Sequence, residues 1–269
     1  MSAKKVLFIA QEIYPYLPES TISTNCRYLP QAIQEKGKEI RAFMPKFGNI
    51  NERRNQLHEV IRLSGMNLII DDSDHPLIIK VASIQAARMQ VYFIDNDDFF
   101  SRKSTIADEG GVEFDDNDER SIFYVRGVLE TIKKLRWIPD IIHCHGWMTA
   151  LTPLYIKTAF ADDPCFKNSK IVYSLYNDDF KTPFKEKFAF KLKLAGVKDQ
   201  DIKELKNSDV DYVKLTNFAV KYADAVVQCE PIVNSQVIDY VTQSKKNFLP
   251  YKEDASEAAH AINEFYNNL

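Results

Sequence analysis

Glycine is scarce in this chain, with eight residues among 269, and cysteine is rarer still, with four. No GxGxxG sequence and no Gly-rich phosphate loop occurs, so the usual sequence marks of dinucleotide or nucleoside-triphosphate binding are absent. The cysteines are widely separated, and no pair has the CxxC spacing of a zinc or redox motif: Cys26, Cys144, Cys165 and Cys229. We therefore expect buried free thiols in a reducing compartment, and no metal or cofactor.

The chain also lacks an excess of basic residues and a long apolar run. Lys plus Arg total 35 and Asp plus Glu total 38, a net charge of −3, which argues against a general nucleic-acid binder. No run approaches the ~18–20 apolar residues of a membrane span. The apolar run at 6–10 is too short for a signal sequence. We expect a cytoplasmic protein with neither a nucleic-acid nor a membrane partner.

With 45% apolar and 27% charged residues, the composition is that of a globular protein, and short apolar runs alternate with amphipathic segments. This alternation predicts strands at 6–10, 40–44, 140–144, 170–175 and 225–228, and helices at 22–36, 119–135, 147–160, 183–195, 210–222, 231–241 and 254–269. Pro30 is expected to kink or restart the first helix. The prediction is an α/β fold, with a Rossmann-like, mainly parallel sheet covered by helices on both faces.

Residues 57–94 have a different pattern. Four β-rich runs at 57–61, 68–70, 77–84 and 91–94 are separated by polar turns, which predicts a meander or hairpins inserted into the α/β fold. We find no internal repeat, low-complexity tract or linker. The expected organisation is one domain over 1–269, with a core at 1–242 and a C-terminal helix at 254–269.

The C-terminal helix has a clear start. Asp254 is followed three residues later by Glu257, which is a capping-box pattern. Its expected apolar face consists of Ala258, Ile262, Phe265 and Leu269. That face either folds back over the domain or forms a dimer contact, and the sequence leaves both open, together with the oligomeric state.

The sharpest local feature is the pair His143 and His145, which precedes Gly146 at the end of a predicted strand. Alternate residues of a strand share a face, so both imidazoles are expected to point the same way. Ligands of open α/β sheets bind at the carboxyl ends of the strands. A metal site would need a third ligand that the local sequence does not offer. Recognition of a polar group such as a sugar hydroxyl, and a purely structural pair bonded to neighbours, both remain open.

Two further stretches are chemically distinctive. Ten acidic residues lie between Asp95 and Glu119, but the spacing does not fit an EF-hand, because Phe99 occupies the third ligand position. Most of these acids are expected to lie in a solvated loop that leads into a helix. Phenylalanines and lysines alternate irregularly over 180–193. They indicate either an amphipathic surface helix or, as we favour, core phenylalanines with solvated lysines.

A series of short motifs then occurs in a recognisable order. They are VLFIAQEIYP at 6–15, LPQAI at 29–33, MPKF at 44–47, VYFIDN at 91–96, FFSR at 99–102, DEGG at 108–111, DNDER at 116–120, HCHGW at 143–147 and ADAVV at 223–227. In this order the chain resembles the N-terminal, acceptor-side domain of bacterial glycogen and starch synthases, from about Lys5 to about Val241. These enzymes are GT-B glucosyltransferases that use a sugar nucleotide, so the resemblance implies one half of a GT-B fold.

The resemblance implies roles for individual residues. Asp116 would be the acidic residue of the acceptor and reaction centre, and His145 would contact the transferred glucose. Glu12 would be an acid near the cleft, with Asn117 and Trp147 shaping the same pocket. His143 is added as a substrate-binding candidate because it shares a strand face with His145.

The chain also departs from the family pattern. Where the family has a Lys-Thr-Gly-Gly-Leu loop that approaches the donor phosphates, this sequence has the segment 18–22, PESTI, so the positive charge is lost and Glu19 adds a negative one. The Asp of the family's His-x-His-Asp-Trp is Gly146 here. Losing one preorganised group typically costs on the order of 100- to 1,000-fold in rate. We therefore expect impaired or absent transfer by the isolated chain.

Three functional hypotheses follow. The first is a glycogen or starch synthase-type glucosyltransferase domain, moving glucose from ADP-glucose or UDP-glucose to an α-1,4-glucan, with a partner chain that supplies a nucleotide-sugar-binding domain. The second is a non-catalytic relative that binds glucan or an oligosaccharide and regulates glycogen metabolism. The third is a reused fold that serves as an interaction module.

Overall fold

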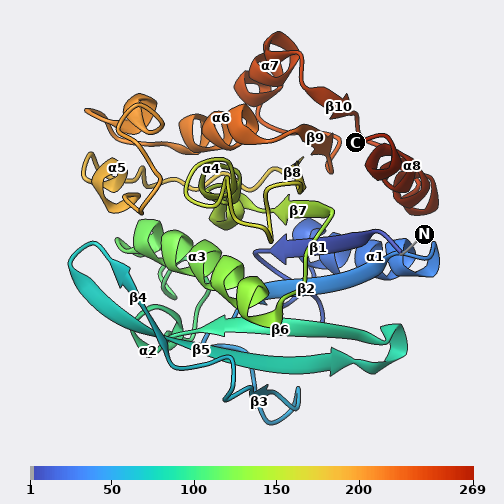
Figure 1. The fold of residues 1–269 in the computed structure, drawn as a ribbon, viewed down its shortest axis with the longest axis horizontal. Coiled ribbons are helices and arrows are strands. Elements are labelled where there is room, and N and C mark those ends of the chain that lie inside the picture. The colour runs from blue at the N-terminus through green and yellow to red at the C-terminus, as the bar shows by residue number, and fades with distance from the viewer. Residues whose placement is uncertain (1–2) are drawn as a thin grey trace.

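The computed structural model describes residues 3–269. Its strands are β1 Lys5–Ala10, β2 Glu39–Pro45, β3 His58–Glu59, β4 Met66–Ile70, β5 Ser73–Ile84, β6 Met89–Asp95, β7 Ile141–His145, β8 Lys170–Leu175, β9 Ala225–Gln228 and β10 Asn247–Leu249. They form a ten-stranded sheet in the order β10-β9-β8-β7-β1-β2-β6-β5-β3, with β4 paired to β5 (Figure 1). The predicted α/β class is confirmed.

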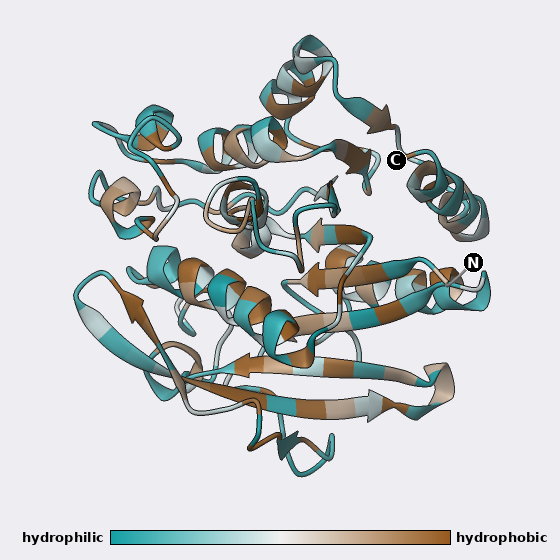
Figure 2. Cartoon of the chain, in the orientation of Figure 1, coloured by the Kyte–Doolittle hydropathy of each residue, from teal (hydrophilic) through white to brown (hydrophobic). Residues whose placement is uncertain are grey.

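The seven strands from β10 to β6 are mutually parallel; β7 is the central one, and β1 lies next to it, between β7 and β2. Residues 6–10 of β1 and all of β7 are buried. Strands covered on both faces read as continuous apolar runs, which explains why 6–10 and 140–144 were recognisable in the sequence. Figure 2 shows the same concentration of apolar residues in the central strands.

The predicted β-rich insertion at 57–94 is also confirmed. β5 pairs antiparallel with β4 and with β6, and β6 then pairs in parallel with β2, which joins the meander to the Rossmann-like part. The β4–β5 turn lies at Asp71, where the backbone is left-handed with a φ of 52°. Aspartate tolerates this conformation better than most residues.

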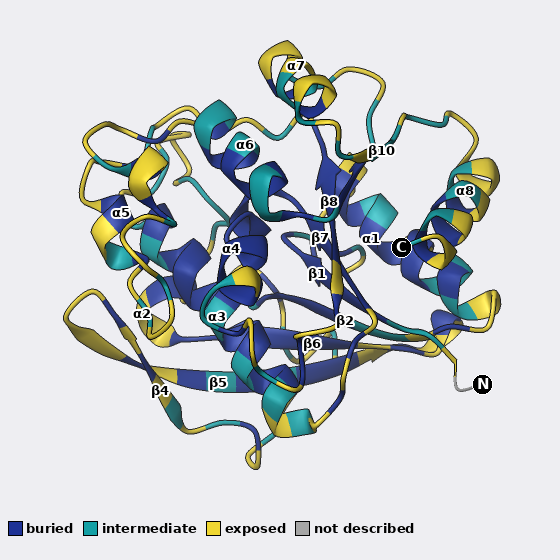
Figure 3. Cartoon of the chain, turned by 45° about the horizontal axis from the view of Figure 1, so that its top comes forward, coloured by how far each residue is buried: buried dark blue, intermediate teal, exposed yellow. Residues whose placement is uncertain are grey.

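Helices cover both faces of the sheet (Figures 1 and 3). α3 crosses one face over β2 and β6, and α1 and α8 lie side by side on the other face. The helices are α1 Thr21–Glu35, α2 Asp97–Phe100, α3 Asn117–Leu135, α4 Thr152–Lys157, α5 Phe188–Lys191, α6 Tyr212–Tyr222, α7 Ser235–Ser244 and α8 Ala255–Asn267, with three short 3-10 helices at 85–87, 147–149 and 203–205.

α1 continues through Pro30 and does not restart there. Proline removes one backbone hydrogen bond and crowds the preceding turn, at a cost of ~3 kcal/mol in an isolated helix. Here Pro30 is itself buried, between Leu29 and Ile33, which belong to the core. Packing of this face against the sheet offsets the local preference, so the expectation of a restart was wrong.

Two predicted helices are shorter than expected. The predicted helix 147–160 is a 3-10 turn at 147–149 followed by α4, which begins just before Pro153. The predicted helix 183–195 is reduced to α5, because Phe184 exchanges two backbone hydrogen bonds with Val210 and is held extended there. Tertiary contacts of Phe184 thus override a local helical pattern.

α8 folds back onto the domain. The Asp254 side chain accepts from the Glu257 N–H, as the capping pattern predicts. The buried face is rotated from the expected one, because the residues that α8 buries are Ala259, Ile262, Asn263 and Tyr266, whereas Ala258, Phe265 and Leu269 are half-buried. The Lys38 ammonium donates to the Asn263 side chain at 2.7 Å, which ties α8 to the start of β2.

None of the helices formed by residues 3–269 combines the length and apolar character needed to cross a bilayer. β10, which the sequence pattern did not reveal, extends the sheet beyond residue 242 and leads into α8.

Candidate functional site

The candidate site lies where β1 and β7 end, at the carboxyl edge of the parallel strands. The Gln11 N–H donates to the His145 carbonyl at 2.9 Å, which continues the β1–β7 pairing past the strand ends. The next residue, Gly146, has a φ of 87°, and a Cβ built there would lie 2.7 Å from the Cβ of Gln11. Position 146 therefore requires glycine for both conformation and space.

His143 and His145 point the same way, as predicted, and their ring centroids are 4.0 Å apart. The His143 ring bonds the Tyr266 hydroxyl at 2.5 Å through Nδ1 and the Ser174 hydroxyl at 2.7 Å through Nε2. The His145 Nδ1 bonds the Tyr176 hydroxyl at 2.8 Å. Among residues 3–269, no group partners the His145 Nε2, which is buried.

Burial fixes the charge state of this pair. Loss of solvation lowers the pKa of His145 to about 3 and holds the pKa of His143 well below its usual range, where the neighbouring His145 adds to the effect. Both imidazoles are neutral near pH 7, so they act as hydrogen-bonding groups and not as proton donors of a charged acid. Both rings are fully covered, so a sugar would reach His145 only after the neighbouring groups move.

Trp147 is buried and packs beneath the carboxyl ends of the strands. Its indole packs on Phe180 and Phe184, with ring centroids 5.1 and 5.8 Å away. Its backbone N–H donates to the Asp178 carboxylate at 2.9 Å, and the Tyr212 hydroxyl donates to the other oxygen at 2.7 Å. Trp147 thus has a packing role in this conformation, and the preference for core phenylalanines is confirmed for Phe180 and Phe184.

Asp178 was not among the residues expected from the sequence. Burial raises its pKa to about 6, although hydrogen bonds from Tyr212 and Trp147 favour the ionised form. The carboxylate joins the ends of β7 and β8 to the start of α6. It follows a predicted strand, and an acid at that position is the signal that could have identified it.

Glu12 is half-buried and faces the start of α1. The Ser20 hydroxyl donates to the Glu12 carboxylate at 2.6 Å and also accepts from the Ser23 N–H at 3.0 Å. Ser20 and Ser23 form a reciprocal capping box, so the protein's own side chains satisfy the N-terminus of α1. The carboxylates of Glu12 and the exposed Glu19 make this end unfavourable for a phosphate.

Asp116 and Asn117 lie at the start of α3. The Arg102 guanidinium binds the Asp116 carboxylate with both terminal nitrogens, and this ion pair is about one third exposed. The contact with Asp116 raises the pKa of Arg102. Asn117 is buried, donates to the Ile106 carbonyl at 2.8 Å and accepts from the Arg120 guanidinium at 2.6 Å. Asn117 thereby braces the loop that precedes α3.

Six of the ten acids in the acidic stretch are paired, so the expectation that most of them are merely solvated is wrong. Its carboxylates bind His75, Lys80, Arg102 or Lys191, or the backbone N–H groups of Lys181 and Thr182: Asp95, Asp98, Glu113, Asp116, Asp118 and Glu119. Among residues 3–269 no group of three or more His, Cys, Asp or Glu side chains is arranged to hold a metal ion.

The structure therefore brings Glu12, His143, His145 and Trp147 together at the ends of β1 and β7. The start of α3 is tied to the segments that follow β8, because the Glu113 carboxylate accepts two backbone N–H groups at 181–182. The partners of the histidines were missed. Ser174 and Tyr176 could have been found from their alternation at the end of β8, but nothing local marks Tyr266.

Comparisons with known proteins agree with this architecture. A family model described as the starch synthase catalytic domain matches residues 5–245. A glycogen synthase of Chlorobium limicola is 38% identical over 174 residues, 64% of this chain and 36% of that protein. A glycogen synthase of Chlorobaculum parvum is 34% identical over 234 residues, 87% of this chain and 47% of that protein. The chain thus spans less than half the length of these relatives.

A solved structure shares the fold. The catalytic domain of starch synthase IV from Arabidopsis thaliana, determined bound to ADP and acarbose, superposes with a TM-score of 0.74 at 18% identity, covering 93% of this chain and 51% of that chain. The resemblance inferred from the sequence motifs is confirmed, and the chain belongs to the starch synthase catalytic domain family.

Proposed function

We propose that this chain is the glucan-binding, acceptor-side domain of a glycogen synthase-type glucosyltransferase, and that it acts in the cytoplasm as a single domain. The agreement between the family match over 5–245 and the position of the HCHGW motif at the carboxyl edge carries the proposal. The starch synthase with the same fold was solved with ADP and acarbose, which supports a sugar ligand for this fold.

The accessible polar groups of this edge are the ones that would meet a glucan first. Glu12 and Asp116 are both partly exposed, and their carboxylates accept hydrogen bonds from sugar hydroxyls. The His145 Nε2 has no hydrogen-bond partner in the described part of the chain but is buried. Contact between His145 and the transferred glucose would therefore require the side chains that cover His145 to move. In this proposal Trp147, Asn117 and His143 position the edge and do not touch the sugar in the closed conformation.

At the start of α1, the chain lacks groups suited to bind the diphosphate of a sugar-nucleotide donor. The start of α1 offers a capping box and two carboxylates where a diphosphate would need N–H groups and a cation. We therefore propose that ADP-glucose or UDP-glucose binds to a nucleotide-binding domain outside residues 1–269, whether in the same protein or on a partner chain. With it, glucose would pass to the 4-hydroxyl of an α-1,4-glucan.

A ligand screen tests the proposal. Maltohexaose should raise the melting temperature of the purified chain, whereas ADP-glucose and UDP-glucose should leave it unchanged. Replacing both edge carboxylates, in Glu12→Ala with Asp116→Asn, should weaken maltohexaose binding at least 10-fold by calorimetry. No binding heat at millimolar maltohexaose would contradict the glucan-binding role. Glucan elongation by the purified chain at an enzyme-like rate would contradict the donor deficit.

A further inference from the structure

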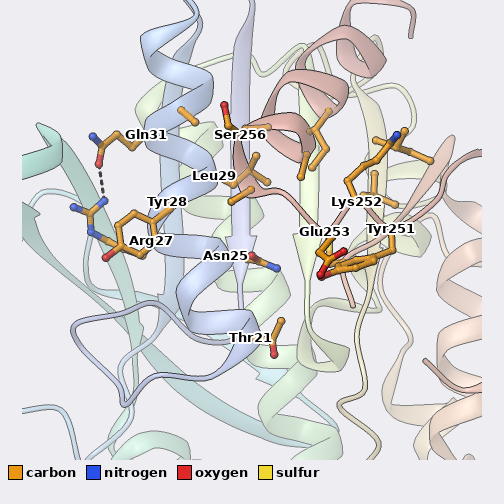
Figure 4. A pocket seen from close by; sticks show the side chains of 18 of the residues that line it. Thr21, Asn25, Arg27, Tyr28, Leu29, Gln31, Tyr251, Lys252, Glu253 and Ser256 are labelled. Carbon is orange, nitrogen blue, oxygen red and sulfur yellow. Dashed lines mark hydrogen bonds between the residues drawn. The ribbon is translucent and has the colours of Figure 1, made fainter. Parts of the chain in front are cut away.

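A cavity of about 830 Å³ lies between α1 and α8, beside the end of β9. Its volume falls within the ~300–1,000 Å³ typical of small-molecule sites. Thr21 and Asn25 line it from α1, and Tyr251 and Glu253 line it from the segment that joins β10 to α8 (Figure 4). The Asn25 amide points across the opening toward that segment. The residues that line the cavity do not include Glu12, His143, His145 or Trp147, although Thr21 directly follows Ser20, which bonds Glu12.

The lining indicates a neutral ligand. Charged side chains of both signs line the cavity, so its electrostatic potential favours neither an anion nor a cation. The cations are Arg27, Lys36 and Lys252, and the anions are Glu35 and Glu253. Two of the cations are already engaged, because Arg27 donates to Gln31 at 2.8 Å and Lys252 donates to Glu257 at 2.8 Å.

The remaining groups suit a polyhydroxylated molecule. Asn25, Thr21 and Ser256 offer an amide and hydroxyls, which both donate and accept hydrogen bonds. Leu29 and Ile262 form an apolar floor, and Tyr251 contributes a half-buried ring with an apolar face. Apolar surface with a few placed hydroxyl and amide groups matches the alternating C–H faces and hydroxyls of a sugar.

One wall of the cavity is connected to His143. Cys229 lines the cavity, and its thiol donates to the Ser174 hydroxyl at 3.2 Å. The same hydroxyl lies 2.7 Å from the Nε2 of His143. A ligand that displaces the Cys229 side chain therefore alters the hydrogen bonding of a fully buried histidine.

A second wall residue is connected to His145. The side chains of Asn25 and Cys229 adjoin the Tyr176 hydroxyl, which lies 2.8 Å from the Nδ1 of His145. A ligand that moves the Asn25 side chain changes the surroundings of the Tyr176 hydroxyl, and with them the bond between Tyr176 and His145. Hydrogen bonds in such buried networks influence one another.

We propose that the α1–α8 cavity binds a short neutral oligosaccharide through Asn25 and Tyr251, and that its occupancy is transmitted to His143 and His145. The choice of a glucan as the ligand rests on the proposed function; the cavity and its connection to the histidines do not. The cavity is then a second sugar site, whose ligand changes the histidine pair behind the carboxyl edge.

The probe is maltotriose, titrated into the full chain and followed by calorimetry and by NMR of the histidine ring protons. The chain has five histidines, so each resonance can be assigned by substitution. Maltotriose should shift the signals of His143 and His145. His58 and His260, which are exposed on β3 and on the outer side of α8, should not respond.

Substitutions separate the two sites. Ala258→Trp places a large ring in the cavity and should weaken this binding event more than 10-fold, whereas His260→Trp adds the same ring to the exposed side of α8 and should have no effect. Asn25→Leu removes the amide without adding bulk, so it tests the site if Ala258→Trp fails to fold. It should abolish the histidine shifts.

The possible outcomes distinguish this inference from the proposed function. Two binding events, one lost in Ala258→Trp or Asn25→Leu and one in the Glu12→Ala, Asp116→Asn variant, support both. One event lost only in the carboxylate variant overturns the cavity site and leaves the proposed function intact. One event lost only in the cavity variants overturns glucan binding at the edge. No maltotriose binding overturns the cavity site, whereas the proposed function is contradicted only if maltohexaose also fails to bind.

Discussion

Polar side chains at the end of β7 and at the start of α3 lie at the same edge of the sheet, but they differ in burial and in charge. His143 and His145 are fully buried and neutral, and hydroxyl groups satisfy three of their four ring nitrogens. Asp116 is partly exposed and bound to the Arg102 guanidinium. One region depends on burial and hydrogen bonds, and the other on charge that water and salt can screen.

The difference explains how the same edge of the sheet can hold its buried side chains rigidly and still offer exposed carboxylates to a ligand. An unpaired polar group in the buried region is costly, so changes there should be large and insensitive to salt. The exposed pair tolerates change, because water replaces a lost partner. Groups that first meet a ligand are therefore expected near Glu12 and Asp116, while the histidines set the shape behind them.

The largest expected effect comes from Tyr266, the α8 residue that bonds His143. Tyr266→Ala should lower the free energy of unfolding by ~3–5 kcal/mol, because it opens a cavity and leaves the His143 Nδ1 unpaired. Tyr266→Phe should cost ~1–3 kcal/mol through the lost hydroxyl alone. Urea unfolding measures both, with Tyr28→Ala, at a site 55% exposed, as the control. Equal losses of unfolding free energy in Tyr28→Ala and Tyr266→Ala would show that the side chains at the end of β7 are not shielded from water.

The next effect is a loss of stability in mild acid. Both histidines have pKa values lowered by burial, so the unfolded chain takes up protons first as the pH falls below ~6.5. Each should contribute a loss of ~1.4 kcal/mol per pH unit below that value. The raised pKa of Asp178 acts in the opposite direction, since the stability it contributes is present at low pH and lost as the pH rises through about 6.

Between pH 7 and 5.5 the two histidines together should lower the free energy of unfolding by ~2.5 kcal/mol, and the opposing contribution of Asp178 should reduce this loss to ~1.5–2 kcal/mol. Urea midpoints measured across this range provide the check. His58→Gln with His260→Gln removes two exposed histidines and should leave the slope unchanged. A flat profile in the original chain would mean that His143 and His145 titrate normally and are accessible to water.

The same contrast shows what a sequence can reveal. The parallel core was predictable because strands such as β1 and β7 are buried on both faces and read as uninterrupted apolar runs. The shared direction of His143 and His145 followed from the two-residue period of a strand. Motif order then led to the correct family, which composition alone would not have reached.

What could not be predicted depends on contacts distant in sequence. Tyr266 meets His143 across 123 positions, and Phe184 is held extended by Val210 against a helical pattern. Pro30 stays within α1 because its neighbours pack in the core. The pairing of the acidic stretch with Lys80, Arg102 and Lys191 required the fold as well.

The smallest expected effect tests the exposed side of the comparison. Asp116→Asn removes one charge of the pair with Arg102 and should lower the free energy of unfolding by no more than ~1 kcal/mol in dilute buffer, because solvent reaches both partners. The loss should shrink further in 1 M NaCl, where the Debye length falls to ~3 Å. Urea unfolding at both salt concentrations measures this, with Asp72→Asn in the exposed β4–β5 turn as the matched control. A loss above ~2 kcal/mol that salt does not change would show that Asp116 is shielded from solvent as the β7 histidines are. The two regions would then not differ in their exposure to water.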